Sequence, residues 1–264
     1  MQATNQISTI SIIGSGNVAT ALGLALSQSG LKVVEVFSPN IANSKLLSSK
    51  IGCNYVENIE KLNLNSDLYI IATPDKEIGN VSSKLKNVVG AIAHTSGSES
   101  ISVFSSFSNN YGVFYPLQTF TVDNVVSFND VPICIEGSNE KTIQLLKTLA
   151  NNISNNVVVI NSQQRQLLHL AAVMVNNFSN SFYDMAHNIL HENDIDFSLL
   201  HPLIKETANK IDKVIPSNAQ TGPARRNDVD TINTHLELLN KHPEYSKLYR
   251  LMSNQIIKKY HGKL

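Results

Sequence analysis

The sequence predicts an α/β domain built on a parallel sheet, followed by an all-α domain. Short β-branched runs alternate with helical patterns from residue 7 to residue 160. The first of these runs ends on a glycine-rich turn that leads directly into a helix. Beyond residue 160 the apolar residues recur only with the helical period. We therefore expect domains at residues 1–160 and 161–264.

The composition indicates a globular protein that acts on small molecules. The chain has 264 residues, of which 42% are hydrophobic, and this is enough to bury a sizeable core. Its 21 basic and 21 acidic residues cancel, so no global field attracts nucleic acid or an anionic membrane. The N-terminal segment lacks a signal-peptide pattern, and no apolar run has the length of a membrane helix. We therefore expect a cytoplasmic protein.

Cysteine usage gives no sign of a metal centre. Cys53 and Cys134 are the only cysteines, and this is too few for a disulfide framework or a zinc site. We therefore expect no metal cofactor.

The segment from Ile7 to Ala25 has the order that a phosphate-binding loop requires. A β-branched strand ends on Gly14-Ser15-Gly16, and a helix follows at once. The first glycine allows a tight turn, and the second lets a pyrophosphate approach the helix N-terminus. The pattern predicts a Rossmann-like dinucleotide site, although a loop that only turns the chain is the alternative. The expected cofactor contacts are Gly14, Ser15, Gly16, Asn17 and Val18.

The end of the second strand bears on the choice of cofactor. NAD-preferring folds usually place an acidic residue there to bind the ribose 2′-hydroxyl. Here the strand 32–37 is followed by Ser38-Pro39-Asn40, with Lys45 a turn later. We therefore expect Ser38 and Asn40 to receive the 2′-phosphate of NADP. Because this segment contains no arginine to bind a 2′-phosphate, NAD remains the alternative cofactor.

Polar residues follow two further strands at the edge where parallel sheets bind ligands. The strand 67–73 stops at Pro74, and Asp75 is expected to cap the next helix. The strand 88–93 leads into His94-Thr95-Ser96-Gly97-Ser98. Alternatively, Ser98 only caps a helix over residues 99–107. The expected cofactor contacts here are Ala72, Thr73 and Pro74, and the expected substrate contacts are His94, Ser96, Gly97 and Ser98.

The remaining elements follow from the same periodicities. Strands are expected at residues 111–114, 131–135 and 157–160, with a helix at 139–153. The predicted helices of the second domain cover residues 163–190, 198–214, 229–240 and 244–259.

The predicted helix over residues 163–190 carries only two charged residues, Arg165 and Asp184. Solvent-facing helices usually carry lysine and glutamate, so this helix is expected to be buried at a domain or subunit interface. Its apolar face comprises Leu167, Leu170, Ala171, Met174, Phe178 and Met185.

The opposite face of this helix is polar. At about 100° per residue, His169, Asn176 and Asn180 fall within roughly 20° of one line. Polar groups on a buried helix find partners or line a cleft. We therefore interpret His169 as a general acid or base and Asn176 as an amide that orients the substrate. The alternative is that both bond to backbone or to a second subunit.

A polar loop over residues 221–228 contains Arg225 and Arg226, which could bind an anion. Alternatively, both arginines pair with Asp228 and Asp230. The low charge of the predicted helices suggests a homodimer whose helical domains pack together and place this loop near a cleft. Arg225 is therefore a candidate substrate ligand.

Six motifs together resemble one bacterial family. They read G-S-G-N-V-A, A-T-P-D-K-E-I, H-T-S-G-S, F-Y-P-L-Q-T-F, L-H-L-A-A-V-M-V-N-N-F and T-G-P-A-R-R-N-D-V-D-T-I-N-T-H-L. The family they resemble joins a Rossmann-like oxidoreductase domain to a C-terminal helical domain of unknown function. It is a distant relative of pyrroline-5-carboxylate reductase and of the 6-phosphogluconate and 3-hydroxyisobutyrate dehydrogenases.

The resemblance also implies site residues. In the hydroxyacid dehydrogenase relatives, a lysine and an asparagine on the first long helix after the nucleotide domain serve the reacting group. His169 and Asn176 resemble these positions, with histidine in place of lysine. In the family's pattern a histidine often precedes P-L-Q-T-F, where this chain has Tyr115. This departure weakens the case for acid–base chemistry at that position.

The leading functional hypothesis is an NADP-dependent oxidoreductase. It would move a hydride between nicotinamide and a small polar carbonyl, imine or hydroxy compound. The alternative hypothesis is a dinucleotide-binding sensor or scaffold without catalytic activity, because a fold does not imply a function.

Overall fold

The computed structural model describes residues 7–121 and 126–262 of the chain. The N-terminal segment judged to lack a signal peptide lies outside these residues. The chain divides into two compact units, Met1–Asn177 and Phe178–Leu264. The last strand ends at Val159, and the first unit continues into the helix that follows. A functional domain boundary near residue 160 stays a prediction.

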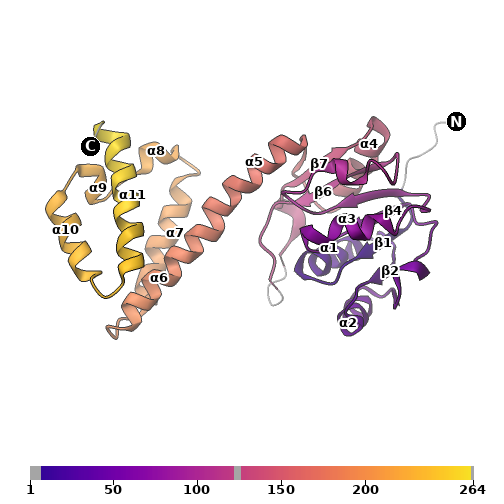
Figure 1. The fold of residues 1–264 in the computed structure, drawn as a ribbon, viewed down its shortest axis with the longest axis horizontal. Helices are drawn as coiled ribbons and strands as arrows, with labels where there is room; N and C mark the ends of the chain where they lie inside the picture. The colour runs from indigo at the N-terminus through magenta and orange to yellow at the C-terminus, as the bar shows by residue number, and fades with distance from the viewer. Residues whose placement is uncertain (1–6, 122–125, 263–264) are drawn as a thin grey trace. The chain divides into compact units, whose positions relative to one another are not determined.

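The first unit contains a mostly parallel sheet, which confirms the α/β class (Figure 1). Its strands lie in the order β3-β2-β1-β4-β5-β6-β7-β8. Among the described strands, neighbours are parallel except β6 and β7, which run antiparallel. The strands are β1 (Ile10–Ile13), β2 (Val33–Phe37), β3 (Asn54–Val56), β4 (Leu68–Ile71), β5 (Ala91–His94), β6 (Tyr111–Pro116), β7 (Ile133–Gly137) and β8 (Val157–Val159).

The antiparallel pair is an exception within the parallel sheet that the sequence predicts. A parallel neighbour requires a crossover connection, which is usually a helix. Among the described residues between β6 and β7, the helical element is a short 3₁₀ turn, η3 (Phe128–Asp130). β7 therefore returns alongside β6 in the opposite direction.

The core lies on both faces of the sheet. On one face α1 (Asn17–Gln28), α2 (Ile41–Ile51) and α4 (Glu140–Asn151) pack against strand residues such as Ile12 and Ile70. On the other face α3 (Asp75–Ser83) and the 3₁₀ turn η2 (Ile101–Phe104) pack against residues such as Ile13 and Ile71. Strands covered on both faces read as continuous apolar runs, and this is why β1 and β4 are recognisable in the sequence.

The predicted cap at Asp75 is wrong, and so is the alternative in which Ser98 caps a helix over residues 99–107. The helix expected over residues 99–107 is only the short turn η2, and Ser100 rather than Ser98 caps it by accepting from Ser102 N–H at 3.2 Å. Pro74 occupies the N-cap of α3. Asp75 instead accepts a hydrogen bond from the Ser98 hydroxyl. A contact across the sheet edge therefore replaces both local caps.

Residues 162–191 are helical throughout, as expected. They comprise α5 (Ser162–Ala172), a π-helical segment (Val173–Phe178) and α6 (Ser179–His191). A reciprocal capping box between Asn161 and Gln164 starts α5. The π-helical segment widens the helix by one residue per hydrogen-bonded turn, a feature that often marks functional sites.

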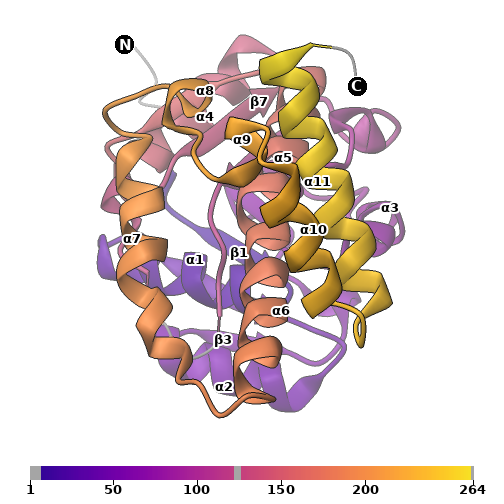
Figure 2. The ribbon, with the colours of Figure 1, turned by 90° about the vertical axis from the view of Figure 1, so that its left-hand side faces the viewer.

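The second unit is helical, which confirms the all-α expectation. Figure 2 shows α9 and α10 beside α11. Within the described residues of this unit, the buried apolar residues are Ala224, Ile232 and Ile257. Its further elements are η5 (Phe197–Leu200), α7 (His201–Lys210), α8 (Pro216–Ala219), α9 (Pro223–Arg226), α10 (Val229–Leu238) and α11 (Pro243–His261). Across the described ranges, no helix is long and apolar enough to cross a membrane.

Candidate active site

The glycine loop after β1 is held close to the end of β4. Gly14 has φ +128°, and a Cβ on it would lie 2.2 Å from the carbonyl oxygen of Ala72. Any side chain would therefore be both strained and blocked by backbone. The Gly14 N–H donates to the Phe37 carbonyl at 2.8 Å. These contacts bring the ends of β1, β2 and β4 together.

The N-terminus of α1 is open to an anion. Gly16 is its N-cap, no side chain caps it, and its first turn has no acidic residue. A Cβ on Gly16 would meet nothing within 4 Å. The free N–H groups of this first turn and the positive end of the helix dipole are therefore accessible to a phosphate.

The end of β2 carries neutral polar groups. The Ser15 hydroxyl donates to the Ser38 hydroxyl at 2.8 Å, which ties the glycine loop to β2. Asn40 caps α2 by accepting from Asn43 N–H at 3.1 Å. Its side-chain oxygen is thereby occupied, while its amide NH₂ remains a donor. The Lys45 Nζ lies over the Tyr55 ring, 5.0 Å from the ring centre.

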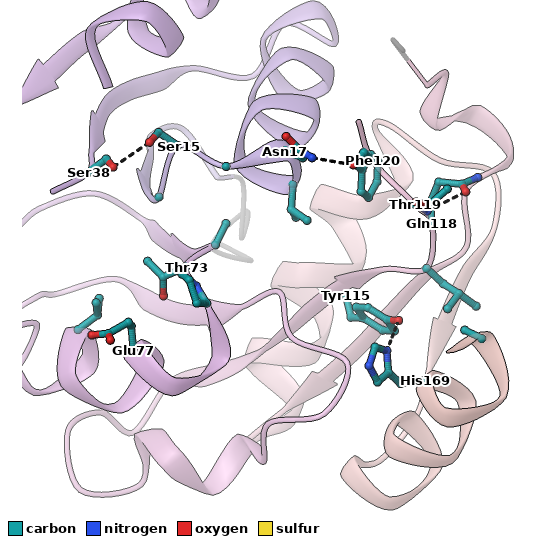
Figure 3. A pocket seen from close by; sticks show the side chains of 18 of the residues that line it. Ser15, Asn17, Ser38, Thr73, Glu77, Tyr115, Gln118, Thr119, Phe120 and His169 are labelled. Atoms are coloured by element: carbon teal, nitrogen blue, oxygen red, sulfur yellow. Dashed lines mark hydrogen bonds between the residues drawn. The ribbon is translucent and has the colours of Figure 1, made fainter. Parts of the chain in front are cut away.

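A cavity of about 1050 Å³ in the first unit lies along this sheet edge (Figure 3). This volume lies just above the range of about 300–1,000 Å³ that is usual for small-molecule sites. The Thr73 hydroxyl is buried and has no hydrogen-bond partner among the described residues. The lining includes every predicted cofactor contact and both predicted catalytic residues: Gly14, Ser15, Gly16, Asn17, Val18, Ser38, Asn40, Ala72, Thr73, Pro74, His169 and Asn176.

These features fit a dinucleotide. An uncapped helix N-terminus, a glycine that permits close approach and an unpaired hydroxyl are all groups that an extended phosphate ligand can use. The individual contacts stay predictions.

The far end of the cavity contains a Tyr–His pair that the sequence did not indicate. Tyr115 on β6 and His169 on α5 form a hydrogen bond of 3.0 Å between the phenol oxygen and Nδ1. Figure 3 shows the two side chains pointing toward each other. Burial raises the pKa of the Tyr115 phenol to about 12. The phenol is therefore neutral at physiological pH. The one feature of the sequence that could have indicated Tyr115 as a site residue is its position near the carboxyl end of a predicted strand.

Asn176 lines the same cavity from the π-helical segment. The wider turn of this segment departs from the 100° spacing that aligned Asn176 with His169 in the sequence. Both residues nevertheless line one cavity. Their catalytic roles stay predictions.

The predicted substrate residues after β5 lie elsewhere than expected. None of His94, Ser96, Gly97 and Ser98 is among the residues that line the cavity. His94 is fully buried, 5.4 Å from the Phe104 ring between centroids, and its Nδ1 accepts from Ser96 N–H at 3.2 Å. Burial, assisted by the Arg165 guanidinium, lowers the pKa of His94 to about 3. His94 is thus a neutral core residue. Contact of His94, Ser96, Gly97 and Ser98 with substrate stays a prediction, and Ser98 is the exposed residue among them.

The same segment packs behind His169. A Cβ on Gly97 would lie 2.5 Å from His169 Nδ1 and 2.9 Å from Tyr115 Cζ. The fully buried Arg165 donates to the Ser96 carbonyl at 2.9 Å and pairs with Glu136 at 3.1 Å. Residues 96–97 are thereby anchored to α5 and β7 and form the support of the Tyr–His pair. The sequence showed Arg165 only as an isolated charge.

Arg225 belongs to the second unit. Its guanidinium lies 4.2 Å from the centre of the Tyr260 ring. Arg226 pairs with Asp228 at 3.7 Å, as the alternative interpretation of the arginines expected for this residue. Asp228 also caps α10 by accepting from Thr231 N–H at 3.1 Å. Substrate binding by Arg225 stays a prediction.

Comparisons with known proteins agree with this architecture. A model described as a Rossmann-like domain matches residues 3–118. A model described as a domain of unknown function, DUF2520, matches residues 131–256. Among curated protein sequences, none matches this chain.

Solved structures resemble the whole chain. The "putative NADP oxidoreductase BF3122" from Bacteroides fragilis is 35% identical, with a TM-score of 0.91 over 97% of this chain and 100% of that one. A reductive aminase from Aspergillus terreus, in complex with NADPH and ethyl-5-oxohexanoate, is 14% identical, with a TM-score of 0.72 over 97% and 96%. An imine reductase from Myxococcus stipitatus, in complex with NADP⁺, is 16% identical, with a TM-score of 0.67 over 97% and 96%. The last two likenesses concern the fold alone.

Proposed function

The chain belongs to the family of the Bacteroides fragilis protein, and from this membership we propose that it is an oxidoreductase that uses NADP, with NAD as the alternative cofactor. Its substrate is a small polar carbonyl, imine or hydroxy compound, and it acts in the cytoplasm. The observation that carries the proposal is one cavity that joins the glycine loop to His169.

Each end of the cavity has its own role in this proposal. The first turn of α1 binds the pyrophosphate through backbone N–H groups. Ser38 and the free amide of Asn40 bind the ribose 2′-phosphate. When bound, the reduced cofactor supplies a hydride to the carbon of a carbonyl or imine. His169 donates a proton to the oxygen or nitrogen of that group, and Asn176 orients the substrate.

Nucleotide binding tests the cofactor part of the proposal. NADPH and NADH are titrated by fluorescence into wild-type protein and into Gly16→Ala. The added methyl group enters the open space where the pyrophosphate would approach, so NADPH affinity falls at least about tenfold while the thermal midpoint is retained. Gly79→Ala is the matched control, because its Cβ makes only an ordinary 3.6 Å contact with Val103. If neither nucleotide binds at millimolar concentration, the proposal is wrong.

A non-catalytic sensor is the competing function, and turnover separates it from an enzyme. A panel of keto acids, imines and hydroxy acids is followed at the nicotinamide absorbance. An enzyme turns over at least one of these compounds, and His169→Gln lowers that rate at least about tenfold, toward the low end of losses from acid–base catalysis. A sensor binds NADP without turnover and tolerates the same substitution.

We also propose that two copies of the chain assemble through their helical units. Among the described residues of the second unit, only three apolar side chains are buried. Large apolar side chains remain exposed there, for example Leu199 at 71% and Leu203 at 63%. A unit of this size usually needs more buried apolar surface to be stable. A second copy would cover these side chains.

Arg225 is proposed as a ligand for an anionic group of the substrate. Its guanidinium lies over a tyrosine ring and has no carboxylate within salt-bridge distance in the part of the chain that the structure describes. It therefore keeps its charge available for an anion. Arg225→Met should raise KM for an anionic substrate and leave KM for a neutral one unchanged.

A further inference from the structure

Tyr115 and His169, which lie far apart in the chain, share a hydrogen bond. The phenol oxygen and Nδ1 are 3.0 Å apart, and the two ring centres lie 6.0 Å apart in an edge-on arrangement. Within residues 7–121 and 126–177, Nδ1 is the ring nitrogen of His169 that is hydrogen-bonded. The other nitrogen, Nε2, is thus left for a ligand of the cavity that His169 lines.

The hydrogen bond can run in either direction, because a neutral phenol can donate or accept and the role of Nδ1 depends on the imidazole tautomer. Because burial raises the pKa of Tyr115, the phenol retains its proton at physiological pH. A neutral imidazole has one N–H donor and one acceptor nitrogen. When the phenol donates to Nδ1, that nitrogen is the acceptor, and the single imidazole proton is on Nε2.

Gly97 packs against one side of Nδ1. A Cβ on Gly97 would be only 2.5 Å from Nδ1, so backbone covers this side of the ring. Arg165 holds that backbone in place through the Ser96 carbonyl. The phenol is therefore the group positioned to decide which ring nitrogen carries the proton.

We propose that Tyr115 is a positioning residue that holds neutral His169 as the Nε2–H tautomer, so that its proton faces the cavity. The inference rests on the proposed oxidoreductase function, in which His169 is the proton donor. In reduction, a hydride reaches the substrate carbon while the Nε2 proton passes to the substrate oxygen or nitrogen. Because a neutral imidazole that only lost this proton would become an imidazolate, Nδ1 takes the phenol proton at the same time, and the Tyr115 oxygen then recovers a proton from solvent. Tyr115 itself transfers no proton to the substrate.

The tautomer can be measured directly by nitrogen NMR. Full-length protein with ¹⁵N-labelled histidine rings is studied about two pH units above the ordinary histidine pKa, where an unperturbed imidazole is neutral. The His169 signals are identified by their loss in His169→Gln. We expect wild-type His169 to carry its proton on Nε2. In Tyr115→Phe, which removes only the hydroxyl, the proton should redistribute toward Nδ1.

A second Tyr–His pair provides the matched control. Tyr249 and His235 in the second unit form the same type of hydrogen bond at 2.7 Å. Tyr249→Phe should change the His235 signals and leave those of His169 unchanged. A wild-type His169 protonated on Nδ1, or a tautomer unchanged in Tyr115→Phe, would overturn the inference. If wild-type protein does not bind NADPH, the proposed function is overturned instead. The two failures can be distinguished because the NMR measurement does not depend on turnover.

Discussion

At the residue scale, the addition of one methyl group at Gly97 should be enough to disturb the Tyr–His pair. Its missing Cβ leaves room for both rings of the Tyr–His pair. In Gly97→Ala the new methyl group must displace the His169 ring, because one contact is 2.5 Å. We expect turnover to fall at least about tenfold, as for a misplaced acid, while NADPH affinity is unchanged. Stopped-flow turnover and nucleotide titration on the same preparation measure both. An unchanged turnover would contradict a role for this close packing.

His94 makes a prediction about pH. Its pKa is lowered from 6.5 to about 3 in the folded protein, so the unfolded chain binds the proton first as the pH falls. Its contribution to stability is therefore fully present above pH 6.5 and is lost as the pH falls from 6.5 toward about 3. The slope for one such group is at most about 1.4 kcal/mol per pH unit.

Comparison with His94→Gln isolates this contribution. Glutamine does not titrate, so the variant should be less stable at pH 7 but should lose less stability between pH 6.5 and pH 5. Most carboxylates remain ionised in this range. Urea unfolding at several pH values gives the two curves. Parallel curves would show that His94 does not remain neutral in the folded state.

At the element scale, the Arg165–Glu136 pair joins α5 to β7 and to the segment after β5. The Arg165 side chain is 0% exposed and that of Glu136 12%. Arg165→Met would leave the Glu136 carboxylate and the Ser96 carbonyl without this partner. We expect a loss of about 3–5 kcal/mol in the free energy of unfolding, which is typical when one partner of a buried pair is removed.

Two further variants test that explanation. Arg165→Met combined with Glu136→Gln removes the orphaned charge and should recover part of the loss. Lys247→Met breaks an exposed pair with Glu244 and should change stability little. Denaturant unfolding gives the free energy of unfolding of Arg165→Met, of the double variant and of Lys247→Met. If the double variant is no more stable than Arg165→Met alone, an unpaired Glu136 charge is not the cause.

At the scale of the whole molecule, the proposed homodimer depends on the exposed apolar side chains of the helical unit. Leu199 and Leu203 are four residues apart and 71% and 63% exposed. Light scattering should give twice the mass of the 29.0 kDa chain. Leu199→Asp with Leu203→Asp should shift the protein toward a monomer, because a dimer interface would have to bury two charges. Val89→Asp, at a site 74% exposed in the first unit, is the control. A monomeric wild-type protein would refute the assembly.

Elements with a strong local pattern were predictable. The glycine loop, the buried strands β1 and β4 and the capping of α10 by Asp228 all depend on residues that are close in sequence. The 3₁₀ turn at η2, the antiparallel β7 and the π-helical segment were not predicted. Their conformations follow from packing and connections that single-sequence periodicity does not describe.

The sequence by itself determined the fold class and the place of the glycine loop, because backbone geometry and apolar periodicity are local properties. Only the tertiary structure decided how His169 is supported. Tyr115 lies 54 residues from it in the chain, and Arg165 reaches a carbonyl 69 residues away. The same tertiary contacts placed His94 in the core and brought Gly97 against the imidazole. Such contacts arise when separate strands end at one edge of a sheet, and spacing along the chain does not specify which side chains meet there.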